Sequence, residues 1–350
     1  MMALKPVSTA LLSYGMSGLV FHAPLLEAHP GFNLTTIVQR HANSARERWP
    51  AVRVARSVEE VFDDPSIELV IVNTPNATHH DFVARALRSG KHVVVEKPFT
   101  VTTVEADDLI SLARKEKKIL TVFHNRRWDG DFMTLKTIVD GNRVGRVVEY
   151  VAHYDRFRNY IERNTWKETA GKGTGILYNL GSHMLDQVLV LFGMPQEVDA
   201  RVWIQREGGQ VDDFYDVRLR YEGFYATVKS SYLVLEQGPR YVLHGTHGSF
   251  VKYGIDPQEQ ALKEGGLPGA KAWGKESPEW WGKLVTAGNH GASTQTIETV
   301  GGNYLDFYEL LYHAIRSGGP VPVAPEDAGR VIRLIEACYE SNRTGRAVTL

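Results

Sequence analysis

The sequence predicts two domains: an α/β domain on a doubly wound parallel sheet, then an α+β domain with a large, mainly antiparallel sheet. The chain of 350 residues exceeds what one hydrophobic core usually organises, so about two domains are expected. In the first third, short β-branched runs alternate with amphipathic helical stretches, which favours parallel pairing. After about residue 125, strands follow one another without intervening helices, which favours antiparallel pairing.

The first domain is expected to contain six strands joined by helices with clear end signals. Ser57 and Glu60 have the spacing of a capping box at a helix start. Gly90 closes the helix expected over 82–88, and Thr102 precedes the helix expected over 104–115. The expected strands are 7–12, 34–38, 52–54, 69–73, 92–95 and 119–123.

The second domain is expected to combine an apolar helix over 176–192 with several alternating strands. A long stretch over 256–300 is rich in Gly, Lys, Glu and Trp and is expected to be irregular. The remaining expected elements are a helix over 131–139, strands over 146–155, 198–206, 215–221, 225–235 and 241–253, and closing helices over 304–317 and 325–342.

Charge and composition exclude several classes of protein. Lysine and arginine number 40 against 41 aspartate and glutamate, so the chain has no bulk field for nucleic acid or an anionic membrane. Cys338 is the single cysteine, which excludes an internal disulfide and a multi-cysteine metal centre. No leader and no long apolar run is evident, and no metal motif occurs. We expect a soluble cytoplasmic protein without nucleic-acid, membrane or metal partners.

A glycine-containing turn follows the first expected strand. The dinucleotide fingerprint needs glycines for a tight turn, for close approach of a pyrophosphate and for helix–strand packing. Ser13 takes the first of these positions, whereas Gly15 and Gly18 keep the second and third. Alone, the pattern is more typical of an ordinary strand-to-helix turn. Its place in a series of βα units favours a dinucleotide site.

The end of the second strand indicates which dinucleotide is bound. NAD sites usually carry Asp or Glu there for the ribose hydroxyls, but this chain has Gln39, Arg40 and His41. A guanidinium suits a 2′-phosphate because it offers a planar set of donors. The sequence therefore predicts NADP rather than NAD. The alternative is that Arg40 is one more surface arginine.

Two groups of residues are candidates for acid–base chemistry. Lys97 follows the fifth strand, where ligands of open α/β sheets bind, although a surface lysine in a turn is the plainer interpretation. On the helix expected over 176–192, Asn179, His183 and Asp186 fall opposite an apolar stripe. Such a face is usually solvated, but its poor helix formers make a place in a cleft an equal alternative, and the sequence alone leaves both open.

Several motifs together resemble the glucose–fructose oxidoreductase, inositol dehydrogenase and MocA (Gfo/Idh/MocA) family over essentially the whole chain. They are residues 14–18 with 21–24, Thr74-Pro75-Asn76 with His79, 90–98 ending in Glu96-Lys97-Pro98, 124–129, and 180–183 with Asp186-Gln187. Residues 21–24 and 124–129 resemble the branch that includes NADP-dependent scyllo-inositol dehydrogenase-like proteins.

The resemblance implies a Rossmann domain over 1–124 and an open-faced α+β domain for substrate binding and oligomerisation over 125–350, with the active site between them. It implies NADP-dependent hydride transfer to or from a carbinol carbon of a sugar or cyclitol, and a homodimer or homotetramer. The implied catalytic residues are Lys97 and His183, with Asn179 beside them. The implied cofactor contacts are Gly15, Met16, Ser17, Gly18, Arg40, Asn73, Thr74, Pro75, Glu96 and Asn125. The implied substrate contacts are His79, Arg126, Tyr154, Arg156 and Asp186.

Two departures from the family pattern bear on activity. Ser13 replaces the first fingerprint glycine, and Asn179 stands where many members carry Asp. A carboxylate four residues before His183 would favour the imidazolium and orient the ring, whereas an amide orients without charge. Asp186 is a candidate to compensate. These departures leave open a second hypothesis, a nucleotide-binding sensor or regulatory protein of the same fold with weak catalysis.

Overall fold

The structure is a computed structural model that describes residues 5–163, 165–289 and 291–350. Internal contacts divide it into two compact units. The first consists of Met1–Trp128, Gln258–Trp273 and Asn303–Gly329, and the second of Asp129–Pro257, Gly274–Gly302 and Arg330–Leu350. The boundary expected after residue 124 is close to the point where the chain first passes into the second unit, between Trp128 and Asp129. Two later segments return to the first unit.

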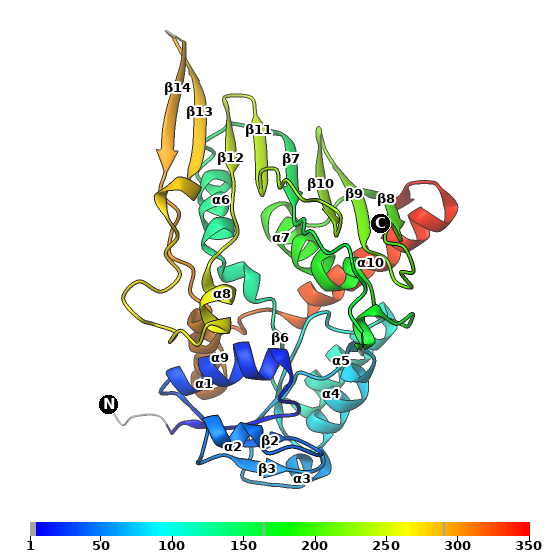
Figure 1. Ribbon diagram of the computed structural model, residues 1–350, viewed down its shortest axis with the longest axis vertical. Coiled ribbons are helices and arrows are strands. Elements are labelled where there is room, and N and C mark those ends of the chain that lie inside the picture. The colour runs from blue at the N-terminus through cyan, green and yellow to red at the C-terminus, as the bar shows by residue number, and fades with distance from the viewer. Residues whose placement is uncertain (1–4, 164, 290) are drawn as a thin grey trace. The chain divides into compact units, whose positions relative to one another are not determined.

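The first unit is built on a six-stranded parallel sheet (Figure 1). Its strand order is β3-β2-β1-β4-β5-β6, so the order reverses between β1 and β4. Such a reversal is the switch point beside which open α/β sheets bind ligands. The bounds are β1 (Val7–Leu11), β2 (Phe32–Val38), β3 (Arg53–Ala55), β4 (Leu69–Val72), β5 (His92–Val95) and β6 (Leu120–Val122).

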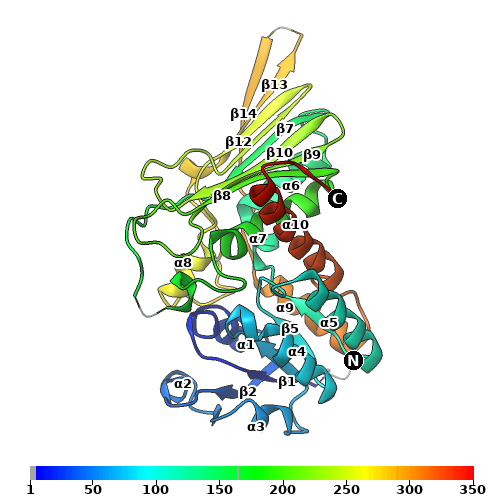
Figure 2. The same ribbon diagram turned by 90° about the vertical axis from the view of Figure 1, so that its right-hand side faces the viewer.

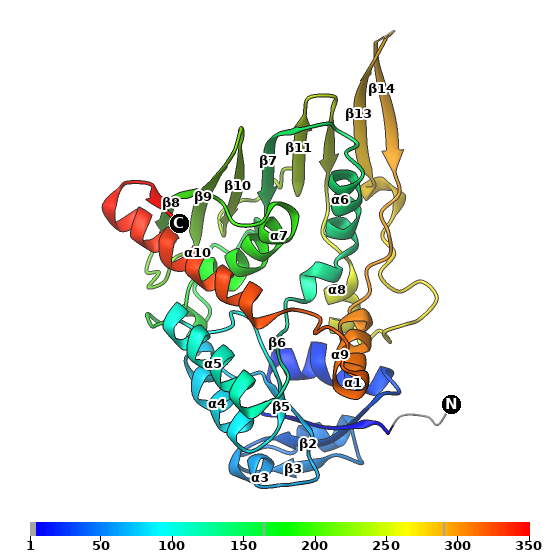
Figure 3. The same cartoon turned by 180° about the vertical axis from the view of Figure 1, so that it is seen from behind.

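Helices lie on both sides of this sheet: α4 and α5 to one side in Figure 3, and α1 and α9 to the other. The expected end signals are confirmed, because Thr102 and Glu105 form a capping box and Gly90 has a left-handed φ of 76°. The bounds are α1 (Ala23–Ala28), α2 (Ser44–Arg48), α3 (Glu59–Phe62), α4 (His79–Arg88), α5 (Thr103–Glu116), α8 (Gln258–Lys263) and α9 (Leu305–Ser317). Shorter segments are η1 (Ser17–His22), η2 (Asn76–Thr78) and η3 (Asn125–Trp128).

Helix α9 belongs to the first unit because of an aromatic cluster. Phe123 at the end of β6 meets Phe307 of α9 edge to face, with ring centroids 4.9 Å apart. Tyr308 packs against Phe32 in the same manner at 5.4 Å. Edge-to-face pairs of this kind add to the hydrophobic gain of burying large rings. Helix α9 is therefore part of the core of the first unit although it lies near the end of the chain.

The second unit contains a nine-stranded sheet in the order β14-β13-β12-β11-β7-β10-β9-β8-β15. Among the strand pairs of the described residues, β7 and β10 alone are parallel, which confirms the prediction of a mainly antiparallel sheet. The bounds are β7 (Val147–His153), β8 (Glu197–Trp203), β9 (Phe214–Tyr221), β10 (Phe224–Ser231), β11 (Tyr241–Gly245), β12 (Gly248–Lys252), β13 (Gly282–Gly288), β14 (Gly291–Ile297) and β15 (Val348–Thr349).

Helices cover one face of this sheet (Figure 2). They are α6 (Gly130–Asp140), α7 (Ser182–Phe192) and the part of α10 (Pro325–Thr344) that lies in the second unit. A π-helical segment, η5 (Leu177–Gly181), leads directly into α7. Short 3₁₀ turns are η4 (Trp166–Glu168) and η6 (Pro278–Trp280). None of the described helices is long and apolar enough to cross a membrane.

Two expectations about the second half of the chain are wrong. The strand expected over 241–253 is a hairpin, β11 and β12, because Thr246 and His247 form a turn between Gly245 and Gly248. The stretch over 256–300 is not irregular throughout, since it contains α8 and the hairpin of β13 and β14. The strand β14 is almost wholly exposed and made of small and polar residues, so no apolar alternation marks it.

Candidate functional site

The carboxyl ends of the parallel strands in the first unit collect the residues predicted to bind a cofactor. Gly15, Met16, Ser17 and Gly18 follow β1, Arg40 follows β2, Asn73, Thr74 and Pro75 follow β4, Glu96 follows β5 and Asn125 follows β6. Because all six strands run in the same direction, these segments share one edge of the sheet. The topology thus brings all ten residues to one edge.

The switch point between β1 and β4 is closed by a direct bond. Asn73 Nδ2 donates to the carbonyl oxygen of Ser13 at 2.8 Å. A Cβ added to Gly18 would lie 2.5 Å from that same carbonyl oxygen and 2.8 Å from Asn73 Nδ2. Gly18 therefore satisfies the packing demand of the fingerprint's third glycine.

Gly15 has a different environment. A Cβ added there would meet its nearest neighbour, Ser13 Oγ, at 3.6 Å, which is an ordinary contact. The protein itself therefore does not require a glycine at this position. The absence of a side chain suits close approach of a ligand to the main chain, as at the fingerprint's second glycine. Ser13 Oγ accepts a hydrogen bond from the Gly15 amide at 3.2 Å and so supports the turn in place of the missing first glycine.

Glu96 joins the end of β5 to the turn after β1. Its carboxylate accepts a hydrogen bond from the Ser17 hydroxyl and another from the main-chain amide of Lys97 at 3.1 Å. The second contact holds the residue that carries the predicted catalytic ammonium. Lys97 itself is half-buried at the same sheet edge.

A buried histidine completes this network. His22 has no exposed surface, and its Nε2 lies 3.1 Å from Glu96 Oε1, while Nδ1 lies 2.6 Å from the Tyr308 hydroxyl. Burial raises the pKa of Glu96, but the hydrogen bond and charge of His22, assisted by Lys97 and Ser17, outweigh it and lower that pKa to about 2. Glu96 is therefore a carboxylate at neutral pH.

The loop after β2 offers positive charge and no carboxylate. The loop itself, residues 39–43, has no acidic residue, and the wider segment 40–56, which includes α2 and β3, contains five arginines and one acidic residue, Glu47, in a chain whose formal net charge is −1. Arg40 and His41 are exposed on this loop. The donor set suits a phosphate at this position better than a pair of ribose hydroxyls.

Asn73 adds a further sign of a missing partner. Its Oδ1 is buried and accepts no hydrogen bond within the described part of the chain. Buried polar atoms are normally paired with protein, water or ligand. Together with the absence of a side chain at Gly15 and the positively charged loop after β2, this atom shows that the residues present fit a dinucleotide.

Two predicted substrate contacts in the first unit are engaged in other bonds. His79 has no exposed surface, and its ring nitrogens lie 2.9 Å from the Pro98 carbonyl oxygen and 3.0 Å from that of Thr74. Burial lowers the pKa of His79. These contacts connect the segment after Lys97 to the end of β4, and the substrate contact of His79 stays a prediction. The buried Arg126 forms an ion pair with Glu259 of α8.

In the second unit, the predicted residues Asn179 and His183 lie on two differently wound segments. The helix expected over 176–192 begins as the π-helical η5, which contains Asn179, and becomes the α-helix α7 at Ser182. Asp212 caps the start, since its Oδ2 accepts from the Leu177 amide at 2.9 Å. Single π turns inside helices are frequent at functional sites. They also alter the angular relation that uniform α-helical periodicity assumes.

The polar face of this helix is not solvated. His183 is 5% exposed and Asp186 1% exposed, and Asn179 is half-buried. Tyr215 and Tyr241 fix α7 to the sheet by donating to Met184 Sδ at 2.9 Å and to Gln187 Oε1 at 3.0 Å. The structure therefore excludes the solvated-face interpretation.

Tyr154 and Arg156, the remaining predicted substrate contacts, lie together after β7. The Arg156 guanidinium carbon is 5.3 Å from the centre of the Tyr154 ring, and that of Arg240 is 4.3 Å from the same ring. Tyr154 is 2% exposed and Arg240 3% exposed. Tyr154, the buried Arg240 and the half-buried Arg156 form a cation–π cluster within the second unit.

Three residues that shape these segments were not predicted from the sequence: His22, Tyr308 and Asp212. His22 lies in the motif over 21–24, so its presence was visible but its bond to Glu96 was not. Tyr308 is 286 residues from its partner, and no local pattern could pair them. Likewise, α8 contacts η1 although it lies in a stretch expected to be irregular.

Comparison with known proteins identifies the family. Residues 8–124 match the model described as "Oxidoreductase family, NAD-binding Rossmann fold", and residues 136–350 match its "C-terminal alpha/beta domain". The chain belongs to the Gfo/Idh/MocA oxidoreductase family. Its first domain is an NAD-binding Rossmann domain, and the fold class is confirmed.

Relatives and solved structures agree with this assignment. The chain is 40% identical over 344 residues to scyllo-inositol 2-dehydrogenase (NADP(+)) IolW of Bacillus subtilis, covering 98% of this chain and 96% of the relative. It is 38% identical to YdgJ of Escherichia coli, an oxidoreductase that is uncharacterized, covering 96% of each chain. The structure of yvaA from Bacillus subtilis superposes with a TM-score of 0.97 at 39% identity, covering 100% of both chains. These findings support the prediction of an NAD(P)-dependent dehydrogenase.

Proposed function

We propose that this protein is an NADP-dependent oxidoreductase that transfers a hydride between nicotinamide and a carbinol or ketone carbon of a cyclitol or sugar resembling scyllo-inositol. The observation that carries the cofactor assignment is the loop after β2, where Arg40 and His41 replace the acidic residue of NAD sites. The NADP(+) dependence stated in the name of the relative IolW supports the same choice.

The residues proposed for the reaction have complementary roles. Bound NADP would supply the hydride acceptor or donor. We propose that the Lys97 ammonium hydrogen-bonds the reacting oxygen and stabilises its developing charge, and that His183 takes up the hydroxyl proton during oxidation. Asn179 would orient the His183 ring without adding charge. Asp186, Tyr154 and Arg156 are proposed to hold a neutral polyol by hydrogen bonds.

The experiment is a screen of inositols, their ketones and common aldoses, monitored by nicotinamide absorbance with both cofactors. We expect reversible, substrate-dependent NADPH formation with at least one polyol and a lower KM for NADP than for NAD. Equal KM values for the two cofactors, or a lower KM for NAD, would refute the proposed role of Arg40 in binding the 2′-phosphate. Activity confined to carbonyls that are not sugars would refute the substrate class.

Lys97 is tested by replacing it with alanine. Removing the ammonium should lower kcat by about 100-fold, the usual scale for an acid–base group. NADPH should still raise the melting temperature, because Lys97 is not among the proposed cofactor contacts. Lys115→Ala on α5 removes an equal charge away from this sheet edge and is the control. Unchanged turnover in the Lys97 variant would show that the role is misassigned.

A second function is favoured by Asn179 and Ser13, the two departures from the family pattern. A nucleotide-binding sensor or regulatory protein of this fold would bind NADPH and show a thermal shift. It would form no NADPH with any polyol in the screen. The same experiment therefore distinguishes the two proposals.

A further inference from the structure

The loop that carries Arg40 and His41 is braced by one arginine of the neighbouring strand. Arg56 directly follows β3, and its Nη1 donates to the carbonyl oxygens of Gln39 at 2.8 Å and Ala42 at 2.7 Å. Its Nη2 donates to Asn43 Oδ1 at 2.6 Å. A single guanidinium thus bridges the beginning and the end of the loop.

The Gln39 side chain provides a second brace. Its Nε2 donates to Ser44 Oγ at 2.9 Å, and its Oε1 accepts from the Ala45 amide at 2.9 Å. The loop is therefore tied to the first turn of α2 as well as to Arg56. Between these fixed points, the exposed side chains of Arg40 and His41 make no hydrogen bond to any described residue.

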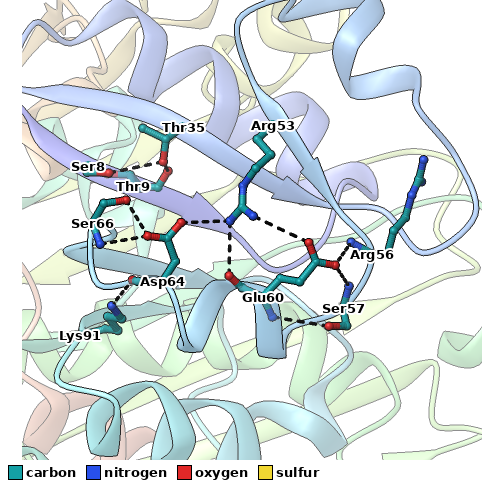
Figure 4. Close-up of polar contacts among 10 residues, drawn as sticks. All are labelled: Ser8, Thr9, Thr35, Arg53, Arg56, Ser57, Glu60, Asp64, Ser66 and Lys91. Carbon is teal, nitrogen blue, oxygen red and sulfur yellow. Dashed lines mark hydrogen bonds and ion pairs between the residues drawn. The ribbon is translucent and has the colours of Figure 1, made fainter.

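Arg56 is itself held in place from the other side. Glu60 Oε1 accepts from the main-chain amide of Arg56 at 2.7 Å and from that of Ser57 at 3.2 Å. Figure 4 shows that the Arg56 side chain extends away from the cluster formed by Arg53, Glu60 and Asp64. The Glu60 carboxylate binds the main chain of Arg56, and the Arg56 guanidinium binds the loop.

We propose that Arg56 is a positioning residue for cofactor selectivity, which holds the loop after β2 in the conformation that presents Arg40 and His41 to the 2′-phosphate of NADP. The inference rests on the NADP preference proposed above. Arg56 would affect that preference indirectly, by holding Arg40 and His41 in position. A loop fixed before binding loses less conformational freedom when the ligand arrives, so the phosphate contacts contribute more fully to affinity.

The chemistry of arginine explains why this residue type is needed. A planar guanidinium has donors in fixed directions and can reach two carbonyl oxygens and an amide oxygen at once. A lysine ammonium carries the same charge but is a compact donor on a flexible stem. Charge alone would therefore not hold the loop. This difference separates a positioning role from a purely electrostatic one.

The test is calorimetric binding of NADPH, NADH and adenosine 2′,5′-bisphosphate to wild type, Arg56→Gln and Arg56→Lys. We expect Arg56→Gln to weaken NADPH and the bisphosphate by about tenfold, or about 1.4 kcal/mol, with NADH changed less than about twofold. Arg56→Lys should behave in the same way. Arg53→Gln, which removes an equal charge from β3 but contacts Asp64 and Glu60 instead of the loop, should leave the NADPH to NADH ratio unchanged.

The outcomes separate this inference from the function on which it rests. Wild type that binds NADPH no more tightly than NADH would refute the NADP proposal. If wild type prefers NADPH and Arg56→Lys keeps the full preference for NADPH over NADH, Arg56 acts by charge alone and the positioning role is refuted. Equal weakening of NADPH and NADH by Arg56→Gln would show general loss of structure and would also overturn it. Asn43→Ala removes one acceptor of the guanidinium, and its effect should not add to that of Arg56→Gln.

Discussion

The two glycines of the turn after β1 should respond in opposite ways to the same substitution. Alanine at Gly18 places a methyl carbon 2.5 Å from the Ser13 carbonyl oxygen, and this oxygen belongs to main chain that cannot move freely. Alanine at Gly15 places its methyl carbon 3.6 Å from its nearest neighbour. Comparing the two variants therefore distinguishes a glycine that packing within the protein requires from a glycine that ligand binding requires.

The expected magnitudes follow from these distances. Overpacking at Gly18 should cost about 1–3 kcal/mol of the free energy of unfolding. Displacement of Asn73 Nδ2 from Ser13 would add about 1 kcal/mol, so Gly18→Ala is expected to lose about 2–4 kcal/mol. Gly15→Ala should be neutral or stabilising by about 0.5 kcal/mol, because alanine restricts the unfolded chain.

The assay is urea denaturation of the nucleotide-free protein, combined with the dissociation constant for NADPH. We expect Gly18→Ala to shift the denaturation midpoint and Gly15→Ala to leave it in place. NADPH binding by Gly15→Ala should weaken by about tenfold or more, because its methyl group would occupy space that the ligand needs. Full NADPH affinity in Gly15→Ala would refute a ligand approaching this main chain. Wild-type stability of Gly18→Ala would refute the packing argument.

Two further predictions concern charge at the proposed site. Asn179→Asp should move the acidic limb of the pH profile of kcat/KM to higher pH, because a carboxylate favours the His183 imidazolium. A profile that does not move would assign the compensation to Asp186 or to solvent. The pKa of Glu96 is lowered in the folded state from its ordinary 4.5 to about 2, against the effect of burial, chiefly by its contact with His22. The ionised Glu96 carboxylate therefore stabilises the folded state above pH 4.5, and this stabilisation is lost as the pH falls toward 2. Glu96→Gln should abolish this part of the pH dependence of the free energy of unfolding, measured by denaturation across that range. An unchanged acid dependence would show that other carboxylates carry it.

The local signals in the first domain predicted its strands and the ends of its helices α4 and α5. The strand expected over 92–95 agrees with β5 (His92–Val95), and the capping signals of Thr102 and Gly90 are found as expected. These signals work because strands and helix ends are determined by residues within one or two turns of each other. Because the strands are parallel, their carboxyl ends share one edge of the sheet, and the predicted cofactor residues that follow them lie at that edge.

The sequence failed where the decisive partner is remote or where the backbone departs from ideal periodicity. The expected strand over 241–253 is a hairpin, because alternation continues through the turn at Thr246 and His247. Asn179 lies in a π-helical segment that uniform periodicity does not reveal. The positions of the Pro98 and Thr74 carbonyl oxygens around the His79 ring were likewise not visible in its motif.

By itself, the sequence determined the order of the elements, the glycine turn and the positive charge after the second strand. These properties depend on neighbouring residues and on charge, which the chain carries whether or not it is folded. Only the tertiary structure decided that His22 joins Tyr308 to Glu96 and that α8 and α9 return to the first unit. It alone also decided that Arg56 supports the loop of Arg40. Burial and hydrogen bonding between distant segments arise when the chain closes on itself, so no local pattern encodes them.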